Sequence, residues 1–434
     1  MAALPPFPWL ARRNSTPWCR TALAGDVSLE EAVASISREL AGQGPADLAL
    51  VFASASYATD LPRLLPLLQR RLRSRHWLGC LGGGVIGTGS DGLPLVREQQ
   101  PALSVMLLRL PGASLRPFAI DTTALPDLDG PAEPWRALSG APAVPNDGAP
   151  ADGNDDGPVS LLVLADPASP GLGDLISGLD YAWPGAVKLG GVAGPHAASH
   201  GSLLMGDGNG AEVRSGAVGC LIRGAWRLEA VVAQGCRPIG PVFEVEQAQR
   251  NVVLQLSRGD QRNSPVSALQ NILSGLSPQE REQVRHSLFL GVGHSSFAMP
   301  SEAEPADTFL VRNLIGVDPR NGAVAVAERI RVGQKVQFQL RDGASSRQEA
   351  RERLCRQAGR QAQPLAALLF ACLGRGEGLH QRPDGDVSLG REAFPSLPIS
   401  GVFCNGEIAP LGGSTHMHGY TAAWAFLVPC APRA

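Results

Sequence analysis

The sequence predicts an α/β (α+β) fold with two related lobes, in which mixed β-sheets are flanked by helices. Apolar segments such as LALVFAS (48–54) are typical of strands that are buried on both faces. Segments with helical spacing of apolar residues alternate with these strands. A unit of strand, glycine-rich turn and strand also occurs three times in the chain, and such a repeat indicates a fold built by duplication.

The first repeat occupies the N-terminal part of the chain. Its expected elements are a helix over 29–40, a strand over 48–54, a helix over 61–77, a glycine-rich turn over 78–89 and a strand over 102–110. Ser28 and Glu31 have the spacing of a capping box, which favours a helix start. Pro62 fits the first turn of the second helix, because proline at this position loses no hydrogen bond.

The other two repeats show the same order. The second has a strand over 159–167, a helix over 172–181 and the segment VKLGGVAGP (187–195); the third has AALLFACLGRG (366–376), PISGVFCNGEIAPLGG (398–413) and AAWAFLV (422–428). Residues 139–158, SGAPAVPNDGAPADGNDDGP, are small, acidic and rich in proline, so we expect a flexible insertion there.

Further strands are expected before the third repeat. They cover 287–293, 309–318, 323–330 and 335–342, with an Asn-Gly hairpin turn between the second and third. Ser346 and Glu349 have capping-box spacing, so a helix is expected from Ser346 to about residue 361. We therefore divide the chain into an N-terminal domain (14–240) and a C-terminal domain (241–434).

Composition limits the function. A net charge of −2 gives no reason to expect nucleic acid or a membrane surface as a partner. The best apolar run, PLAALLFACL, has about half the roughly 20 residues of a membrane-spanning helix. Prolines stand where a signal peptide has its apolar helix, so a cytoplasmic location is expected. None of the eight cysteines forms C-x-x-C, which argues against a structural zinc site.

Several strings in the C-terminal half resemble those of one known family. They are FLVRNLIGVDPRNGA, VGQKVQFQLRD, LLFACLGRG, PISGVFCNGEIAPLGG and HGYT, and their order resembles the C-terminal domain of FIST (F-box and intracellular signal transduction) proteins. LGGGVIG and VKLGGVAG are similar to the FIST N-terminal domain. The resemblance implies a sensory protein that binds a small ligand, such as an amino acid or a related polar metabolite. With no F-box, kinase or cyclase segment in the sequence, the output would pass to a separate signalling protein.

The leading site hypothesis pairs two charges in glycine-rich turns. Arg375 follows an apolar strand between two glycines, where its guanidinium could hold a carboxylate. Glu407 could bind a cationic group, and Cys404, Asn405 and Gly406 could offer backbone N–H groups to a zwitterionic ligand. The alternative is structural: the glycines turn the strand, Glu407 satisfies neighbouring backbone amides, and Arg375 forms a salt bridge with Glu377 or Glu407.

Three further residues are candidates for the pocket wall. Arg312 lies within an apolar strand and needs a partner if it is buried. His294 and His418 are expected in turns that line the pocket rather than in a catalytic or metal role. His416 and His418 could share one face and one metal ion, but two histidines are too few ligands, so no metal is expected. The run Gly82–Gly89 lacks a nucleotide-binding pattern, so no cofactor is expected.

Two other functions remain open. Cys404 or Cys372 could be the nucleophile of an enzyme if a nearby base lowered the thiol pKa. The protein could instead be an adaptor that binds a protein partner without any small ligand. A binding role is favoured over catalysis, because no nucleophile elbow or paired catalytic motif is present.

Overall fold

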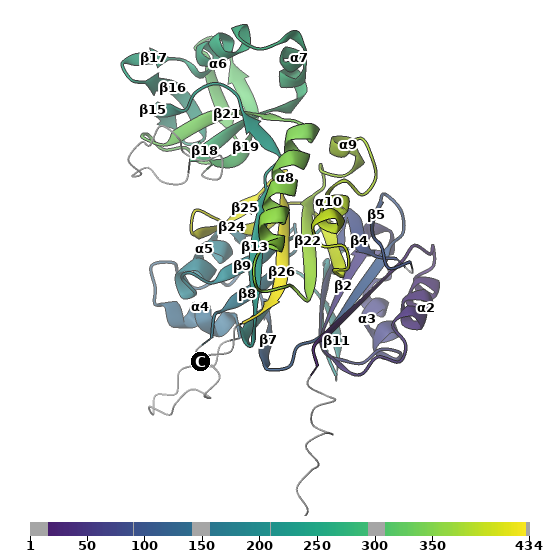
Figure 1. Ribbon diagram of the computed structural model, residues 1–434. Helices are drawn as coiled ribbons and strands as arrows, with labels where there is room; N and C mark the ends of the chain where they lie inside the picture. Colours follow the sequence, from purple (N-terminus) through teal and green to yellow (C-terminus); the bar gives the residue numbers. More distant parts are fainter. Residues whose placement is uncertain (1–15, 90, 141–156, 209, 294–308, 431–434) are drawn as a thin grey trace, which may run out of the picture.

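The computed structural model describes residues 16–89, 91–140, 157–208, 210–293 and 309–430 (Figure 1). These residues form two bodies, a larger one with three mixed sheets and a smaller one drawn at the top of Figure 1. The predicted α/β (α+β) fold with mixed sheets and flanking helices is confirmed. Most of the expected insertion over 139–158, and His294, lie outside the described residues.

The three sheets of the larger body share one strand order. An edge strand and a second strand run antiparallel, two parallel strands follow, and a hairpin completes each sheet. The first sheet contains β1 (Trp18–Ala24), β6 (Leu103–Arg109), β2 (Ala46–Ser54), β3 (Ser74–Gly82), β10 (Leu203–Asp207) and β11 (Ala211–Arg214). The second contains β7 (Ala113–Ile120), β12 (Ala217–Gly224), β8 (Ser160–Ala165), β9 (Val187–Val192), β24 (Glu407–Leu411) and β25 (Ser414–His418). The third contains β13 (Trp226–Ala233), β26 (Ala422–Pro429), β22 (Ala366–Cys372), β23 (Ile399–Cys404), β4 (Gly84–Thr88) and β5 (Pro94–Glu98).

The hairpin that completes each sheet comes from a different repeat. The hairpin β4–β5 follows β3 in the chain but pairs with β23 of the third sheet. The hairpin β10–β11 follows β9 and pairs with β3, and β24–β25 follows β23 and pairs with β9. This cyclic exchange confirms the predicted threefold repeat. The repeat relates three units of the larger body, whereas the smaller body has a different topology.

Glycines at equivalent positions of the three repeats permit the close approach of the parallel strands. A Cβ atom added at Gly79 would lie 1.9 Å from the carbonyl oxygen of Val51. The corresponding distances are 1.7 Å from Gly190 to Val163 and 2.0 Å from Gly401 to Leu369. Real Cβ contacts are never this short, so any side chain would force the strands apart. The repeated glycine is therefore explained by strand packing.

The turns after these strands bind one another. Gly83 N–H donates to Phe403 O at 3.1 Å, Gly194 N–H to Leu81 O at 2.9 Å, and Asn405 N–H to Val192 O at 2.9 Å. Each hydrogen bond connects one repeat to the next, and the three together form a closed ring. The glycine-rich turns thus use their backbone groups to join the repeats.

Two helices cover the outer face of each sheet, and the inner faces meet in one apolar core. The helices are α2 (Leu29–Glu39) and α3 (Leu61–Gln69), α4 (Ala132–Leu138) and α5 (Leu172–Ala182), and α8 (Gly343–Ala358) and α10 (Gly385–Ala393). Short helices η1 (Ala55–Tyr57) and α9 (Glu377–His380) lie in connections. Within the described ranges, no helix combines the length and the apolar character that crossing a membrane requires.

The smaller body is a closed antiparallel barrel inserted between β13 and α8. Its strands are β14 (Cys236–Pro238), β15 (Phe243–Gln249), β16 (Val252–Arg258), β17 (Gln261–Asn263), β18 (Leu288–Gly293), β19 (Phe309–Asp318), β20 (Ala323–Val326) and β21 (Lys335–Arg341). Pairing of β18 with β21 closes the barrel, and α6 (Pro265–Ser274) and α7 (Pro278–Ser287) belong to it. The expected domain border at 240/241 falls near the entry to the barrel, but the chain returns to the larger body after Arg341.

Two expected helices have different limits. The helix expected over 61–77 ends at Gln69, because residues from Ser74 pair with β2 as part of β3. The helix expected from Ser346 begins earlier, at Gly343, and its N-cap is Asp342, whose carboxylate accepts hydrogen bonds from the N–H groups of Ala344 and Ser345. The expected capping box is therefore wrong, and Ser346 is free to take part in another contact described below.

Candidate functional site

A pocket of about 590 Å³ lies between the two bodies. The larger body contributes the turn at Asn405 and Gly406, the strand β25 and part of α5. The barrel contributes residues of β19, among them Arg312, and the two residues that follow β20, one of which is Glu328. The structure thus brings four of the predicted site residues, Arg312, Asn405, Gly406 and His418, to one pocket.

Arg312 is the cation of this pocket. Its Nε donates to the carboxylate of Glu328 at 2.8 Å, and its Nη1 donates to the carbonyl oxygen of Val311 at 3.2 Å. The side chain is 13% exposed. The described part of the chain provides no hydrogen-bond acceptor for Nη2, so this end of the guanidinium can bind a ligand. The partner that a largely buried arginine needs is therefore Glu328, two residues after the end of β20.

The turn at Asn405 contributes side chains rather than backbone donors. The N–H of Asn405 binds Val192, and the carbonyl oxygen of Gly406 accepts from the N–H of Val192 at 2.8 Å. The exposed Asn405 side chain lines the pocket. The prediction that this turn offers N–H groups to a ligand is wrong for Asn405, because the neighbouring repeat already occupies that donor.

The histidines of β25 form a second wall. The rings of His416 and His418 are 6.4 Å apart and nearly perpendicular. His418 is buried, and its Nε2 lies 3.1 Å from the carbonyl oxygen of Ala409. The hydroxyl of Thr415 donates to Asp180 at 2.7 Å, which anchors the strand to α5. Among the described residues no group of three or more side chains could hold a metal ion.

Cys404 and Glu407 do not line the pocket, and both are fully buried. One carboxylate oxygen of Glu407 accepts from the N–H of Thr421 at 3.2 Å, and the other has no hydrogen-bond partner in the described structure. Burial raises the pKa of Glu407 well above its ordinary value, which disfavours the charged carboxylate. The predicted role of Glu407 as an anionic ligand contact is therefore not supported.

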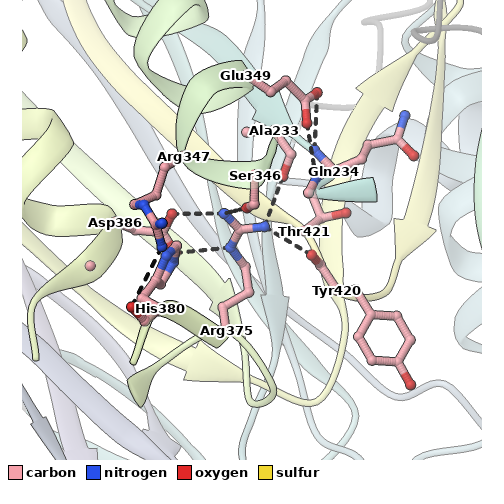
Figure 2. Close-up of polar contacts among 12 residues, drawn as sticks. Ala233, Gln234, Ser346, Arg347, Glu349, Arg375, His380, Asp386, Tyr420 and Thr421 are labelled. Atoms are coloured by element: carbon pink, nitrogen blue, oxygen red, sulfur yellow. Dashed lines mark hydrogen bonds and ion pairs between the residues drawn. The ribbon is translucent and has the colours of Figure 1, made fainter. Parts of the chain in front are cut away.

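Arg375 is also fully buried and belongs to a separate cluster (Figure 2). Its Nε and Nη2 donate to the two oxygens of Asp386 at 2.8 and 2.7 Å. The remaining N–H groups donate to Ser346 Oγ at 2.8 Å, Tyr420 O at 3.0 Å and Ala233 O at 3.5 Å. All five donors of the guanidinium are used. The prediction that Arg375 binds a ligand is wrong, because no donor and no exposed surface remain.

The carboxylate of Asp386 is the anion of this cluster. Burial by itself would raise the pKa of Asp386, but the charge and hydrogen bonds of Arg375 lower it below its ordinary value. His380 Nε2 lies 3.2 Å from the same carboxylate. The arrangement is a buried ion pair whose lone pairs and protons are satisfied by neighbouring segments, so its role is to fix those segments.

These segments are the two chain crossings between the bodies. The first crossing contains Gln234 and Gly235, whose N–H groups donate to Glu349 at 3.3 and 2.9 Å (Figure 2). A Cβ atom at Gly235 would lie 2.4 Å from Nη1 of Arg375, so the linker passes directly over the guanidinium. The second crossing leads from Arg341 into α8, which carries Glu349.

Tyr420 connects this cluster with the barrel. Its backbone carbonyl accepts from Arg375, and its hydroxyl accepts from Asn313 Nδ2 at 3.0 Å. The ring lies 4.5 Å from the ring of Phe289 and 4.8 Å from the guanidinium carbon of Arg341. Tyr420 has a φ of 62°, which is uncommon for a bulky residue and indicates that the contacts on both sides hold it there.

The thiols do not support a nucleophilic role. Cys404 is fully buried, and burial raises its pKa well above the ordinary value. Cys372 is partly buried, and burial together with the nearby Glu407 raises its pKa as well. A thiolate is therefore disfavoured at both positions, which argues against the cysteine-dependent enzyme.

Sequence reasoning missed Glu328, Asp386 and the role of Tyr420. Pairing of Leu314 with Val326 in the hairpin β19–β20 places Glu328 across from Arg312. Counting outward from the Asn-Gly turn would have pointed to Arg329 instead, because a register shift between Leu314 and Gly316 moves the pairing by one residue. No sequence signal identifies Asp386 as the partner of Arg375, because the contact depends on how α10 packs against the end of β22.

Two family models together match most of the chain. The FIST N domain model matches residues 47–258, and the FIST C domain model matches residues 265–410. The chain belongs to the FIST family. FIST domains are sensory domains of signal transduction. Uncharacterized protein Rv0628c of Mycobacterium tuberculosis is 32% identical over 400 residues, which are 92% of this chain and 95% of that protein. Uncharacterized protein Mb0898c of Mycobacterium bovis is 30% identical over 402 residues, 92% of this chain and 94% of that protein.

Proposed function

We propose that this FIST protein is a cytoplasmic sensor that binds a small polar metabolite, such as an amino acid, in the pocket between its two bodies. The observation that carries the proposal is the position of the pocket. Both bodies line it, and Arg312, Glu328 and Asn405 place positive, negative and neutral polar groups around one volume. A volume of about 590 Å³ suits a small metabolite.

The charges suggest how such a ligand would be held. The outer edge of the Arg312 guanidinium would accept a carboxylate, since planar N–H pairs match carboxylate geometry. The carboxylate of Glu328, whose side chain is 36% exposed, would lie near a ligand ammonium group. The Asn405 amide can donate or accept, and it would complete the contacts from the larger body.

Binding at this position would report on the relative placement of the two bodies. Because each body supplies part of the pocket wall, a ligand that contacts both would favour the orientation in which the walls are correctly spaced. The signal would then pass to a separate signalling protein that recognises this orientation.

Isothermal titration calorimetry with a panel of amino acids tests the proposal. We expect at least one amino acid to bind, and Arg312→Ala to weaken its binding about tenfold or more, as for the loss of a charge-assisted hydrogen bond. Arg329→Ala is the matched control, because Arg329 is an exposed neighbour that does not line the pocket. Absence of binding by every amino acid, or equal binding by the Arg312 variant, would refute the proposal.

A further inference from the structure

A second pocket lies at the opposite ends of the strands in the first sheet. It has a volume of about 520 Å³ and lies where β2 and β3 begin and where β6 and β10 end. No barrel residue lines it, and the glycine-rich turns follow the other end of β3. It is therefore distinct from the pocket between the two bodies.

Three arginines line this second pocket: Arg73, Arg75 and Arg109. Arg73 and Arg75 are two positions apart at the start of an extended strand, so their side chains leave the chain on the same side. Both are exposed, and for neither does the described part of the chain supply an ion-pair partner. Three arginines and two acids, Asp47 and Asp207, thus line the pocket, and one of the acids, Asp47, is paired with Arg109.

Arg109 is held in place by Asp47, and each oxygen of this carboxylate already accepts one hydrogen bond. Its Nη1 donates to Oδ1 of Asp47 at 2.6 Å, while Oδ2 of Asp47 accepts from the N–H of Leu110 at 2.7 Å. The Arg109 side chain is only 29% exposed, so its position is defined. Asp207, the other acid of the pocket, accepts from the N–H of Gly210 at 2.9 Å in its own turn.

The neighbouring Arg70 and Arg71 have a simpler explanation. They follow the C-terminal end of α3, where positive charge is favourable because of the helix dipole. Arg73, directly before β3, and Arg75, on β3, lie beyond this end, and the helix does not explain them. Three guanidinium groups around one recess match the several oxygens of a phosphate group better than the two oxygens of a carboxylate.

We propose that this pocket binds a small phosphorylated metabolite, with its phosphate between Arg73, Arg75 and Arg109. A bare phosphate would leave most of the volume empty, and the apolar side chains of Leu72 and Trp77 line the remainder. A recess of this size fits a small molecule. A net charge of −2 for the chain does not favour a long polyanion.

Calorimetric titration of the full chain with inorganic pyrophosphate tests the site. We expect a dissociation constant below about 1 mM, and binding about tenfold weaker or worse for Arg73→Gln and for Arg75→Gln. Arg38→Gln removes the same charge from the exposed surface of α2 outside the pocket, and it should bind within about twofold of the wild type. Unchanged melting temperatures without pyrophosphate would show that the variants are folded.

Three results would overturn the proposal. They are absence of pyrophosphate binding, equal binding by the wild type and both pocket variants, and an equal loss in the Arg38 variant, which would indicate a general charge effect. A single-stranded DNA oligonucleotide is titrated in parallel. Tighter binding of the oligonucleotide with loss in the same two variants would assign the arginines to nucleic acid instead.

Discussion

The ion pair of Arg375 and Asp386 gives the sharpest prediction about stability. Asp386→Asn would remove the charge that faces a fully buried guanidinium through hydrogen bonds of 2.7 and 2.8 Å. Breaking a buried pair on one side leaves an uncompensated charge, which costs about 3–5 kcal/mol of unfolding free energy. We expect a loss in this range for Asp386→Asn.

The matched control lies on α10, the helix that carries Asp386. Arg351 of α8 and Glu392 of α10 also form an ion pair, at 2.9 Å, but their side chains are 43% and 51% exposed. Exposed pairs contribute about 0–1 kcal/mol, so Glu392→Gln should cost no more than that. Urea unfolding followed by circular dichroism and by tryptophan fluorescence measures both losses and shows whether the two signals change together. Losses that differ by less than about 1 kcal/mol would refute the reasoning.

The same pair determines part of the response to acid. Because the pKa of Asp386 is lower in the folded protein than the value of about 3.9 in an unfolded chain, the unfolded state binds more protons as the pH falls. The stability from this group is therefore present at neutral pH and is lost below about pH 4. The wild type should lose stability with acid more steeply than Asp386→Asn. Parallel pH curves for the two proteins would contradict this.

Three further perturbations have directions that follow from the structure. Glu407→Gln should increase stability more at pH 8 than at pH 5, because the raised pKa of Glu407 makes the folded wild type less stable as the pH rises. Thermal melts of both proteins at the two pH values test this, and equal changes in melting temperature would contradict it. Gly190→Ala should cost more than about 3 kcal/mol or prevent folding, whereas Gly173→Ala, with no atom within 4 Å of its Cβ, should be tolerated; folded yield and urea unfolding compare them. Tyr420→Ala should increase amide exchange in the linker 233–236 without changing exchange in β8, since its contacts with the barrel are lost; an unchanged linker would show that Tyr420 does not hold the two bodies together.

Local patterns were sufficient for many elements of the fold. Ser28 caps α2 as predicted, accepting from the N–H of Glu31 at 3.3 Å, because a cap depends only on residues within one turn. One strand of each parallel pair (β2, β8 and β22) was identified from continuous apolar sequence. The expected glycine-rich turns were wrong in part, because these segments contain the partner strands β9 and β23 and much of β3. The limits of α3 were not identified, because RRLRSRHW has no local break, and pairing of β3 with β2 determines where the helix ends. The exchange of hairpins was also beyond prediction, since it depends on contacts between residues more than 100 positions apart.

The sequence by itself determined that three glycine-rich units follow apolar strands and that the chain is similar to FIST proteins, because these properties depend on residue type and spacing. It also placed Arg312, Asn405 and His418 among the candidates, without the evidence that they meet. Only the tertiary structure decided which charges face solvent. Arg375 and Glu407 have the same local surroundings of glycines as an exposed site would have, but helix α10 brings Asp386 to the first and the three-sheet core buries the second. Burial and charge pairing arise from segments distant in the chain, and the short patterns around a residue carry no record of them.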